Sequence, residues 1–416
     1  MRILHVVTAF PRRPGDVIVP WLVELSHELQ QAGHEVEVFC PAYRGGGGDE
    51  YAGIPVHRFR YFPARWEDLT HDEAAPDRLR RSWRHKVMPP FYVAGGVVGI
   101  WRLCRRRRYD IVHVHWPMPH AVFGAVARAT CGAALVTLWY GAELRWVQGP
   151  LRWLRWLVRW ALRTSDQVVA ISSYTAQEIA QFADVAVRVI PYTVGFALEP
   201  TPAMSPRSAP RRAFRILFVG RLVERKGVAG LLDAVERLPA ALGAQLEIVG
   251  DGPDRTRLDT QTRRAGLQGR VRLRGRISTP ELREAYATAD VLVLPSIRDS
   301  RGDTEGLGVV LLEAMSYGVP VIGARVGGIP DIVVDGESGL LVPPGDTTAL
   351  VAALERLAGD PVLAARLREG GVQRVREHFS WRTIVGEWEA CYQAALARRR
   401  GLSAFAEGPG PRAAPS

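Results

Sequence analysis

The chain has 416 residues, of which 47% are hydrophobic and 23% are charged, a composition ordinary for a soluble protein of two or three domains. The net charge is +11, but no nucleic-acid recognition motif is present, so we expect no nucleic-acid partner; an anionic substrate or membrane surface explains the charge as well. Four widely spaced cysteines argue against a disulfide framework and a structural zinc site and fit a reducing compartment: Cys40, Cys104, Cys131 and Cys391.

The first half of the chain alternates strand and helix patterns. The opening residues Met1-Arg-Ile-Leu-His-Val-Val form a short strand pattern and not a signal peptide, so we expect a cytoplasmic protein. Apolar runs typical of buried parallel strands lie at residues 3–8, 36–40, 111–114, 135–138, 168–171 and 187–190. Helical patterns lie at residues 19–32, 121–130, 151–163 and 174–182. This alternation predicts a parallel sheet covered on both faces.

Two helical segments of this half bear on membrane contact. Residues 87–103 contain Pro89, Pro90 and Arg102, so we interpret them as a buried helix, and we expect no segment to reach the length needed to span a bilayer. Residues 151–163 form a basic, tryptophan-rich helix, which suits the surface of an anionic membrane and a peripheral location at its inner face. Packing of its apolar residues on the sheet, with arginine in water, is the favoured interpretation. The residues concerned are Arg152, Arg155, Arg159, Arg163, Trp153, Trp156 and Trp160.

A proline-rich stretch at residues 198–212 predicts a linker between an N-terminal domain (1–197) and a C-terminal domain (213–379). In the second domain we expect strands at residues 215–219, 245–249, 271–273, 291–294, 319–323 and 339–342. We expect helices at residues 227–238, 255–265, 280–287, 307–317, 347–358 and 361–375. A final helix lies within residues 380–400 and is a candidate to pack back on the first domain; residues 401–416 are predicted to be disordered.

The pattern therefore predicts two doubly wound α/β domains. Such domains bind ligands at the carboxyl ends of their strands, so the active site is expected between the two domains.

Residues 305–320 read E-G-L-G-V-V-L-L-E-A-M-S-Y-G-V-P and place two carboxylates eight positions apart. Glu305 should lie just before a helix and Glu313 inside it, roughly on the same side. The N–H groups of Gly306, Leu307 and Gly308 would point outward at the helix start, which is a ready site for phosphate. Carboxylates repel phosphate, and their natural partners are hydroxyls. A pyrophosphate flanked by hydroxyl-rich groups describes a nucleotide sugar.

Only two of the 54 cationic residues are lysines, Lys86 and Lys226. Lys226 stands in the turn from Gly220 to Gly227, after the apolar run Ile216-Leu-Phe-Val. Lysine is a compact point charge suited to phosphate, so Arg221 and Lys226 are candidates to neutralise a diphosphate. Solvated charges on a surface turn are the simpler interpretation of this motif alone, but the carboxylate block downstream favours ligand binding.

These motifs resemble the retaining GT-B glycosyltransferases of family 4. The resemblance rests on G-R-L-x-x-x-K-G, G-D-G-P, E-G-L-G-x-x-x-x-E-A-M-x-x-G-x-P-V-I and G-G-I-P-D-I-V, and it covers most of residues 213–385. It implies two Rossmann-like domains that face each other across a cleft, with the donor held mainly by the second. The roles that it implies are diphosphate binding by Gly220, Arg221 and Lys226, ribose binding by Glu313, and contact with the transferred sugar and phosphate by Glu305, Gly306 and Leu307.

The resemblance also implies that Glu305, Arg221 and Lys226 are the catalytic residues and that neither a metal nor a cofactor is needed besides the nucleotide-sugar co-substrate. The sequence agrees on the metal because it has no Asp-x-Asp motif. The nearest match, Asp299 to Asp303, has the wrong spacing; we interpret it as a solvated loop, with a role in sugar recognition as the alternative.

The first domain departs from the family pattern. The family often has a histidine before a glycine after the fourth strand, where this chain has Trp139-Tyr140-Gly141, so either Trp139 or Tyr140 takes that place and Tyr140 could offer a hydroxyl. The family's His-x-His pattern favours His115 facing the cleft on the acceptor side, and a hydrogen-bonded histidine at a strand end is the alternative. Gly15 is a single glycine where the family has two; it could let the backbone approach a phosphate, and an ordinary turn is an equal interpretation.

We expect a retaining, metal-independent hexosyltransferase that uses a nucleotide-diphosphate sugar. The acceptor is expected to be a glycan or a lipid-linked sugar in cell-surface polysaccharide or glycolipid synthesis. Two alternatives stay open: a nucleotide-sugar epimerase on the same architecture, and a non-catalytic subunit that binds a nucleotide sugar.

Overall fold

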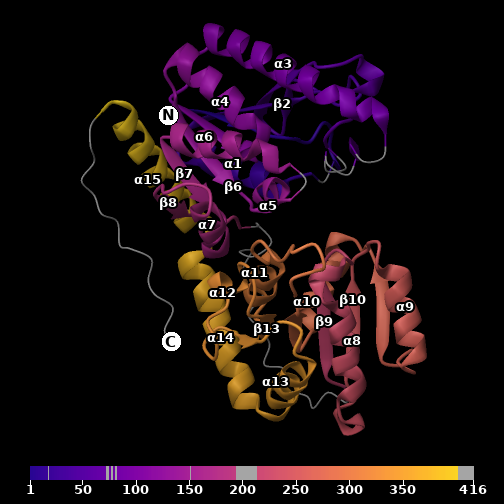
Figure 1. Ribbon diagram of the computed structural model, residues 1–416. Coiled ribbons are helices and arrows are strands. Elements are labelled where there is room, and N and C mark those ends of the chain that lie inside the picture. The colour runs from indigo at the N-terminus through magenta and orange to yellow at the C-terminus, as the bar shows by residue number, and fades with distance from the viewer. Residues whose placement is uncertain are drawn as a thin grey trace.

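The computed structural model describes residues 1–16, 18–71, 75, 78, 79, 82–149, 151–193 and 213–401. The predicted linker, and all of the predicted tail except residue 401, lie outside the described residues. The chain forms two α/β domains, each built on one mainly parallel sheet (Figure 1). The predicted fold class is therefore confirmed.

The N-terminal sheet has eight strands in the order β3-β4-β2-β1-β5-β6-β7-β8, and only β3 runs antiparallel to its neighbour. Its strands are β1 (Arg2–Val6), β2 (Glu35–Pro41), β3 (Glu50–Tyr51), β4 (Ile54–Phe59), β5 (Ile111–His115), β6 (Ala134–Trp139), β7 (Gln167–Ala170) and β8 (Val187–Val189). Its helices are α1 (Pro20–Gln31), η1 (Ala64–Trp66), α3 (Trp83–Arg106), α4 (Pro117–Cys131), α5 (Ala142–Gln148), η2 (Arg152–Leu154), α6 (Arg155–Thr164) and α7 (Ser173–Ala180).

Residues on β1 show how this sheet is covered on both faces. Ile3 packs in a core with α1, whereas its neighbour Leu4 packs in a second core with α3 and α4, because successive side chains of a strand point to opposite faces. Four elements in the described part of this domain were not predicted: β3, β4, the 3-10 helix η1 and the short helix α5. Strand β4 was missed because it lies near the sheet edge and is only partly buried, so polar residues interrupt its apolar run.

The C-terminal sheet has six parallel strands in the order β11-β10-β9-β12-β13-β14, the order of a doubly wound fold. Its strands are β9 (Arg215–Val219), β10 (Gln245–Val249), β11 (Val271–Gly275), β12 (Val291–Leu294), β13 (Val321–Ala324) and β14 (Leu340–Val342). Its helices are η4 (Glu224–Lys226), α8 (Val228–Arg237), η5 (Ala240–Leu242), α9 (Arg255–Arg264), α10 (Thr279–Thr288), α11 (Val309–Ser316), α12 (Ile329–Ile332), α13 (Thr347–Gly359) and α14 (Pro361–His378).

The last helix, α15 (Trp381–Arg399), leaves the second domain and lies against the first (Figure 1). Trp388 and Tyr392 are buried there, and the Tyr392 hydroxyl lies 2.9 Å from Nδ1 of His113 on β5. Two further contacts join α15 to the domain: His34 to Glu389 at 2.9 Å and Arg188 to Glu387 at 3.7 Å. Removing a buried aromatic side chain such as Trp388 costs about 3–5 kcal/mol, so α15 fastens the domains together.

Helix α3 corrects two predictions. Residues 87–103 were expected to form a buried helix, but only one side of α3 is buried, and Trp83 and Phe91 are exposed. We also expected no segment long enough to span a bilayer. Among the described residues, α3 alone has the length and apolar composition for it, with 24 residues. Its buried side packs closely on the domain, since a Cβ on Gly96 would lie 2.2 Å from the Phe123 ring.

The carboxyl edges of the two sheets face each other. The start of α7, which follows β7, contacts segments that follow β12 and β13: the Ser173 backbone N–H donates to Asp331 of α12 at 2.6 Å, and the Arg298 guanidinium donates to the Tyr174 hydroxyl at 3.1 Å. Because ligands of such sheets bind at this edge, these segments border the candidate active site.

Candidate active site

Lys226 reaches the site from the turn that follows β9. Gly227 ends the 3-10 helix η4 with a φ of +67°, and an added Cβ there would lie 1.9 Å from the carbonyl oxygen of Pro295. Only glycine permits this approach to the segment that follows β12. The close approach directs Lys226, which is buried, toward Glu305 on that segment.

Glu305 and Lys226 form a buried ion pair, with 2.5 Å between Nζ and Oε2. Arg225 lies on the other side, with Nη1 3.7 Å from the same oxygen, and the Ser296 hydroxyl lies 3.5 Å away. Burial raises the pKa of Glu305, but the charges of Lys226 and Arg225 outweigh it and hold the pKa below its ordinary value. Glu305 is therefore an anion at neutral pH, clamped between two cations.

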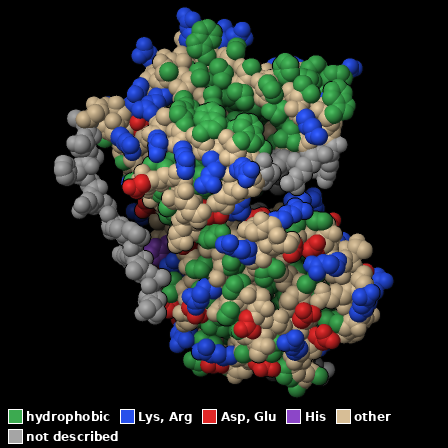
Figure 2. Space-filling view, viewed as in Figure 1, with side chains coloured by type: hydrophobic (Ala, Val, Ile, Leu, Met, Phe, Trp, Pro, Cys, Tyr) green, Lys and Arg blue, Asp and Glu red, His purple; other side chains and the backbone are tan. Residues whose placement is uncertain are grey.

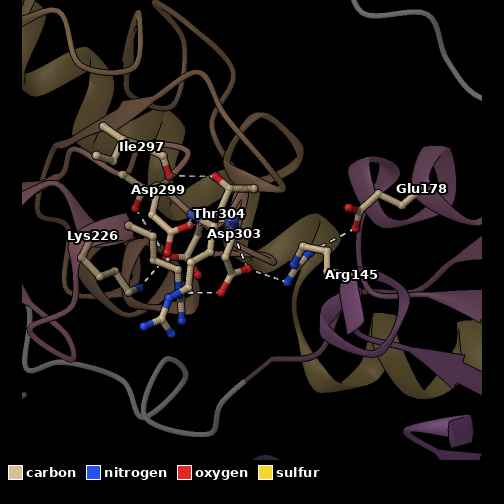
Figure 3. A network of polar contacts seen from close by, with 11 residues as sticks. Arg145, Glu178, Lys226, Ile297, Asp299, Asp303 and Thr304 are labelled. Carbon is tan, nitrogen blue, oxygen red and sulfur yellow. Dashed lines mark hydrogen bonds and ion pairs between the residues drawn. The ribbon is translucent and has the colours of Figure 1, made fainter. Parts of the chain in front are cut away.

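A chain of alternating charges continues from this pair into the first domain (Figure 3). Arg225 lies 3.4 Å from Asp303, and Asp303 lies 2.7 Å from Arg145 of α5. Arg145 in turn lies 3.1 Å from Glu178 of α7. Asp303 thus stands in a partly exposed loop, and its carboxylate also joins the two domains.

Asp299, in contrast, organises its own loop. Its carboxylate accepts hydrogen bonds from the backbone N–H groups of Arg301 at 2.9 Å and Asp303 at 2.8 Å. This arrangement holds the Asp303 carboxylate where Arg225 and Arg145 can reach it.

Glu313 lies inside α11, as predicted, and its carboxylate accepts a hydrogen bond from the Tyr286 hydroxyl. Burial raises the pKa of Glu313 to about 7. Tyr192, which follows β8 of the first domain, lies close enough to both glutamates for their charges to add to the effect of burial in raising its pKa. The two carboxylates thus converge on one region between the domains.

Helix α11 begins at Val309, two residues later than predicted, because Gly308 has a φ of +95° and stands before the first turn. Gly306 and Leu307 therefore precede the helix and are not part of it. An added Cβ on Gly306 would lie 3.3 Å from the Ile171 side chain and 3.7 Å from the carbonyl oxygen of Tyr140. The segment after Glu305 thus lies directly against the first domain.

Glycines behind this segment hold it in place. Gly327 has a φ of +60°, and an added Cβ there would lie 1.9 Å from the carbonyl oxygen of Glu305. The backbone N–H of Gly328 donates to that carbonyl at 3.1 Å. Larger residues here would push Glu305 out of its position.

Of Trp139 and Tyr140, it is Tyr140 that takes the position where the family often has a histidine. The Trp139 side chain is fully buried in the core with α5 and α6. The Tyr140 ring stacks on Trp116 with 4.2 Å between centroids, and its hydroxyl lies 3.0 Å from Nδ1 of His115. Trp21 of α1 lies 5.8 Å from the Tyr140 ring. Tyr140 therefore belongs to an aromatic cluster at the carboxyl edge of the first sheet.

His115 was expected to face the cleft, and this was wrong, since its side chain is fully buried. Its Nε2 lies 2.9 Å from Nδ1 of His5 on β1. Burial lowers the pKa values of His5, His113 and His115, so all three are neutral at pH 7. Their ring nitrogens lie within 4.8 Å of one another, the one such grouping in the described part of the chain that could hold a metal.

The remaining predicted residues are Gly220, Arg221 and Gly15. Gly220 and Arg221 follow β9, and the Arg221 side chain is exposed. Gly15 lies in the loop between β1 and α1 with a φ of +87° and open space around it. The cation that accompanies Lys226 at Glu305 is thus Arg225, and Arg221 lies outside that contact.

Sequence reasoning missed Arg225, Arg145, Tyr286 and Tyr192. Arg225 precedes Lys226 and could have been found by its position. Tyr192 follows the last strand of the first domain and could have been found by that position. Arg145 and Tyr286 belong to no motif that we recognised.

Two parallel-sheet domains with facing carboxyl edges, and cations and carboxylates gathered between them, are the architecture of a GT-B enzyme. Residues 204–374 match the family described as glycosyl transferases group 1, and residues 19–193 match the glycosyl transferase 4-like domain. The chain belongs to the GT-B glycosyltransferases.

Relatives of known activity span nearly the whole chain. The chain is 30% identical over 396 residues to the GDP-mannose-dependent alpha-(1-6)-phosphatidylinositol monomannoside mannosyltransferase of Mycolicibacterium smegmatis, which covers 91% of this chain and 95% of the relative. It is 25% identical over 399 residues to the N-acetyl-alpha-D-glucosaminyl L-malate synthase of Bacillus anthracis, covering 94% and 96%.

Solved structures show the same fold. Sucrose-phosphate synthase from Thermosynechococcus elongatus superposes with a TM-score of 0.73 at 22% identity, covering 95% of this chain and 99% of that one. HepE of Anabaena in complex with UDP superposes with a TM-score of 0.70 at 20% identity, covering 95% and 100%.

Proposed function

We propose that this glycosyltransferase transfers a sugar from a nucleotide-diphosphate sugar to a glycan or lipid-linked acceptor in cell-surface polysaccharide or glycolipid synthesis. The observation that carries the proposal is the Lys226–Glu305 pair with Arg225 beside it, at the carboxyl edge of the second sheet. Lys226 and Arg225 are held there by Glu305 and Asp303, and a donor diphosphate would share these two cations with the carboxylates. The names of the relatives support the class of donor and acceptor.

In this proposal Lys226 and Arg225 face the donor diphosphate, and Arg221 closes over it from the surface of the same turn. Negative charge develops on the diphosphate as the bond at the anomeric carbon breaks, and cations held in place before the reaction stabilise that charge. Removing one such contact typically costs roughly 10²–10³ in rate. Gly220 and Gly15 let backbone approach the phosphates from either domain.

The donor sugar and ribose would meet the two carboxylates. Glu305, with the N–H groups of Gly306 and Leu307, contacts the transferred sugar and its phosphate. Glu313 accepts hydrogen bonds from the ribose hydroxyls. Tyr140 lies next to Gly306 and contacts the sugar or acceptor from the first domain, with His115 behind it as a positioning residue.

We further propose that the reaction retains the anomeric configuration and needs no metal ion. Lys226 and Arg225 would supply at the diphosphate the positive charge that a metal supplies elsewhere. A cytoplasmic location fits the four free cysteines.

Donor binding tests the proposal first. Titration calorimetry with UDP-, GDP- and ADP-sugars should show binding of one donor, and Lys226→Met should weaken it strongly while Lys86→Met leaves it unchanged. No binding of any donor, or equal affinity in both variants, would overturn the site assignment.

Product analysis separates the rivals. Transfer to a glycan or lipid-linked acceptor, with the anomeric configuration followed by NMR and activity measured with and without a chelator, tests each finer claim. Conversion of the donor to another sugar without any acceptor would indicate an epimerase. Binding without transfer to any acceptor would indicate a non-catalytic subunit.

A further inference from the structure

Three helices form one layer over a face of the first sheet. Helix α4 packs against α3 on one side and α6 on the other (Figure 1). Figure 2 shows apolar side chains gathered over this part of the molecule, with Lys and Arg side chains at their margin, whereas the second domain shows a mixture of both charge signs. The outer surface of this layer is therefore unlike the rest of the visible face.

The exposed side of α3 is apolar along most of its length. Trp83 is 78% exposed, and further large apolar side chains follow it at intervals that keep them on one side of the helix. Surface helices of globular proteins normally place polar side chains outward, so this stripe needs another explanation. The stripe consists of Trp83, Val87, Phe91, Val98 and Trp101.

Helix α6 and the turn η2 extend this surface. Trp153 is 67% exposed and Trp156 is 61% exposed, while Val158 and Leu162 anchor the helix in the core. Packing of the tryptophans on the sheet, the favoured interpretation of the sequence, is therefore wrong for these two and holds only in part for Trp160. We call the α3 stripe, Trp153 and Trp156 the α3–α6 surface.

The charge of this layer has one sign. The sequences of α3, α4, η2 and α6 contain no Asp and no Glu. Arg84 and Arg128 pair with carboxylates outside the layer, at 2.8 Å and 3.1 Å. Within the part of the chain that the structure describes, no carboxylate pairs with the other cations of these elements: Lys86, Arg102, Arg105, Arg106, Arg152, Arg155, Arg159 and Arg163.

We propose that the α3–α6 surface docks the protein on an anionic lipid membrane. Tryptophan is suited to the headgroup level, where its ring enters the apolar region, and arginine beside it meets lipid phosphates. A second copy of the chain is a poorer occupant, because a symmetric interface would bring the same cations against each other. The layer would lie on the membrane, since the other side of α3 is buried on the domain.

Vesicle flotation of the full chain tests this without donor or acceptor, so its outcome is independent of the proposed function. The chain should float with phosphatidylcholine vesicles that contain phosphatidylglycerol, and binding should fall with salt. The double substitution Trp153→Ser and Trp156→Ser should weaken vesicle binding about tenfold or more, because it removes the apolar area that the two tryptophans would bury in the lipid. Val362→Ser, an exposed apolar residue of the second domain, is the matched control.

The charge contribution is tested separately. Arg152→Ser should weaken binding about fivefold, because a basic residue near such a surface contributes on that scale. The exposed Arg264→Ser of the second domain is its control and should change nothing.

Three results would overturn the proposal. These are absence of flotation with anionic vesicles, flotation that the tryptophan pair does not affect, and flotation equal with and without phosphatidylglycerol. Light scattering in the same buffer identifies the alternative occupant: a dimer that the tryptophan substitutions abolish, without vesicle binding, would assign the surface to a second copy. Circular dichroism of each variant verifies that the fold is kept.

Discussion

The buried pair of Lys226 and Glu305 predicts a large effect of one substitution. At an effective dielectric of about 20, charges 2.5 Å apart attract by about 7 kcal/mol and charges 3.7 Å apart, the distance of Arg225, by about 4 kcal/mol. Desolvation offsets much of this attraction, and removing one partner of a buried pair costs about 3–5 kcal/mol. Because Arg225 still faces Glu305, we expect Lys226→Met to destabilise the second domain by about 3 kcal/mol.

The same substitution should change the pH dependence of stability. In the native chain the cations hold the pKa of Glu305 below its ordinary 4.5, so its contribution is present above that value and is lost as the pH falls through the lower, folded-state pKa. With Lys226 removed, burial should prevail and raise the pKa of Glu305 above its unfolded value. Stability should then fall as the pH rises through that interval.

Hydrogen exchange measured on peptides of β9 and β12 reports the opening free energy of the second domain separately from the first. The chain offers a matched control, since its only other lysine, Lys86, is exposed on α3; Lys86→Met should stay within about 0.5 kcal/mol of the native chain. Lys226→Met combined with Glu305→Gln should recover part of the loss. An effect of Lys226→Met as small as that of Lys86→Met would refute the reasoning.

Three further predictions concern the site. Donor affinity should increase as the pH rises through about 7, the pKa of Glu313, because the ionised carboxylate is the stronger acceptor; calorimetry should show no such increase in Glu313→Gln. Asp303→Asn breaks the contact with Arg145 and should favour a more open arrangement of the domains, by about 1 kcal/mol at most for a partly exposed pair; small-angle scattering, with Asp259→Asn as control, measures it. Tyr140→Phe leaves Nδ1 of His115 without its partner and should cost about 1–3 kcal/mol in unfolding free energy by denaturation.

Most strands of the second domain could be predicted, because a parallel strand that is buried on both faces appears in the sequence as a short run of apolar residues. The bounds of β9, β10 and β12 agree with those runs residue for residue. Lys226 and Glu305 could be assigned to one site, since both stand after strands whose carboxyl ends share one edge, but their direct ion pair was not predicted. The ion pair between Asp303 and Arg145 was missed because Arg145 belongs to the other domain. No local sequence pattern indicates how two domains are placed relative to each other.

The errors on α3 and His115 have one physical cause. The composition of a segment shows that it is apolar, but whether it is buried depends on what packs over it. Residues 87–103 are apolar on both sides, and neighbouring helices cover only one of them. His115 ends a strand at the ligand-binding edge, yet Tyr140 and Trp21 cover it from the first domain.

The covering of the histidines is completed from the far end of the chain. Tyr392 of α15 reaches Nδ1 of His113, whose ring stacks on that of His115 with 4.1 Å between centroids. A strand-end histidine with an open path to solvent would titrate near neutral pH. Once α15 lies over the sheet, desolvation lowers the pKa and the ring stays neutral. Helix α15 therefore contributes to the burial that keeps His113 neutral, while His115 lies beneath the partly buried Tyr140 and Trp21.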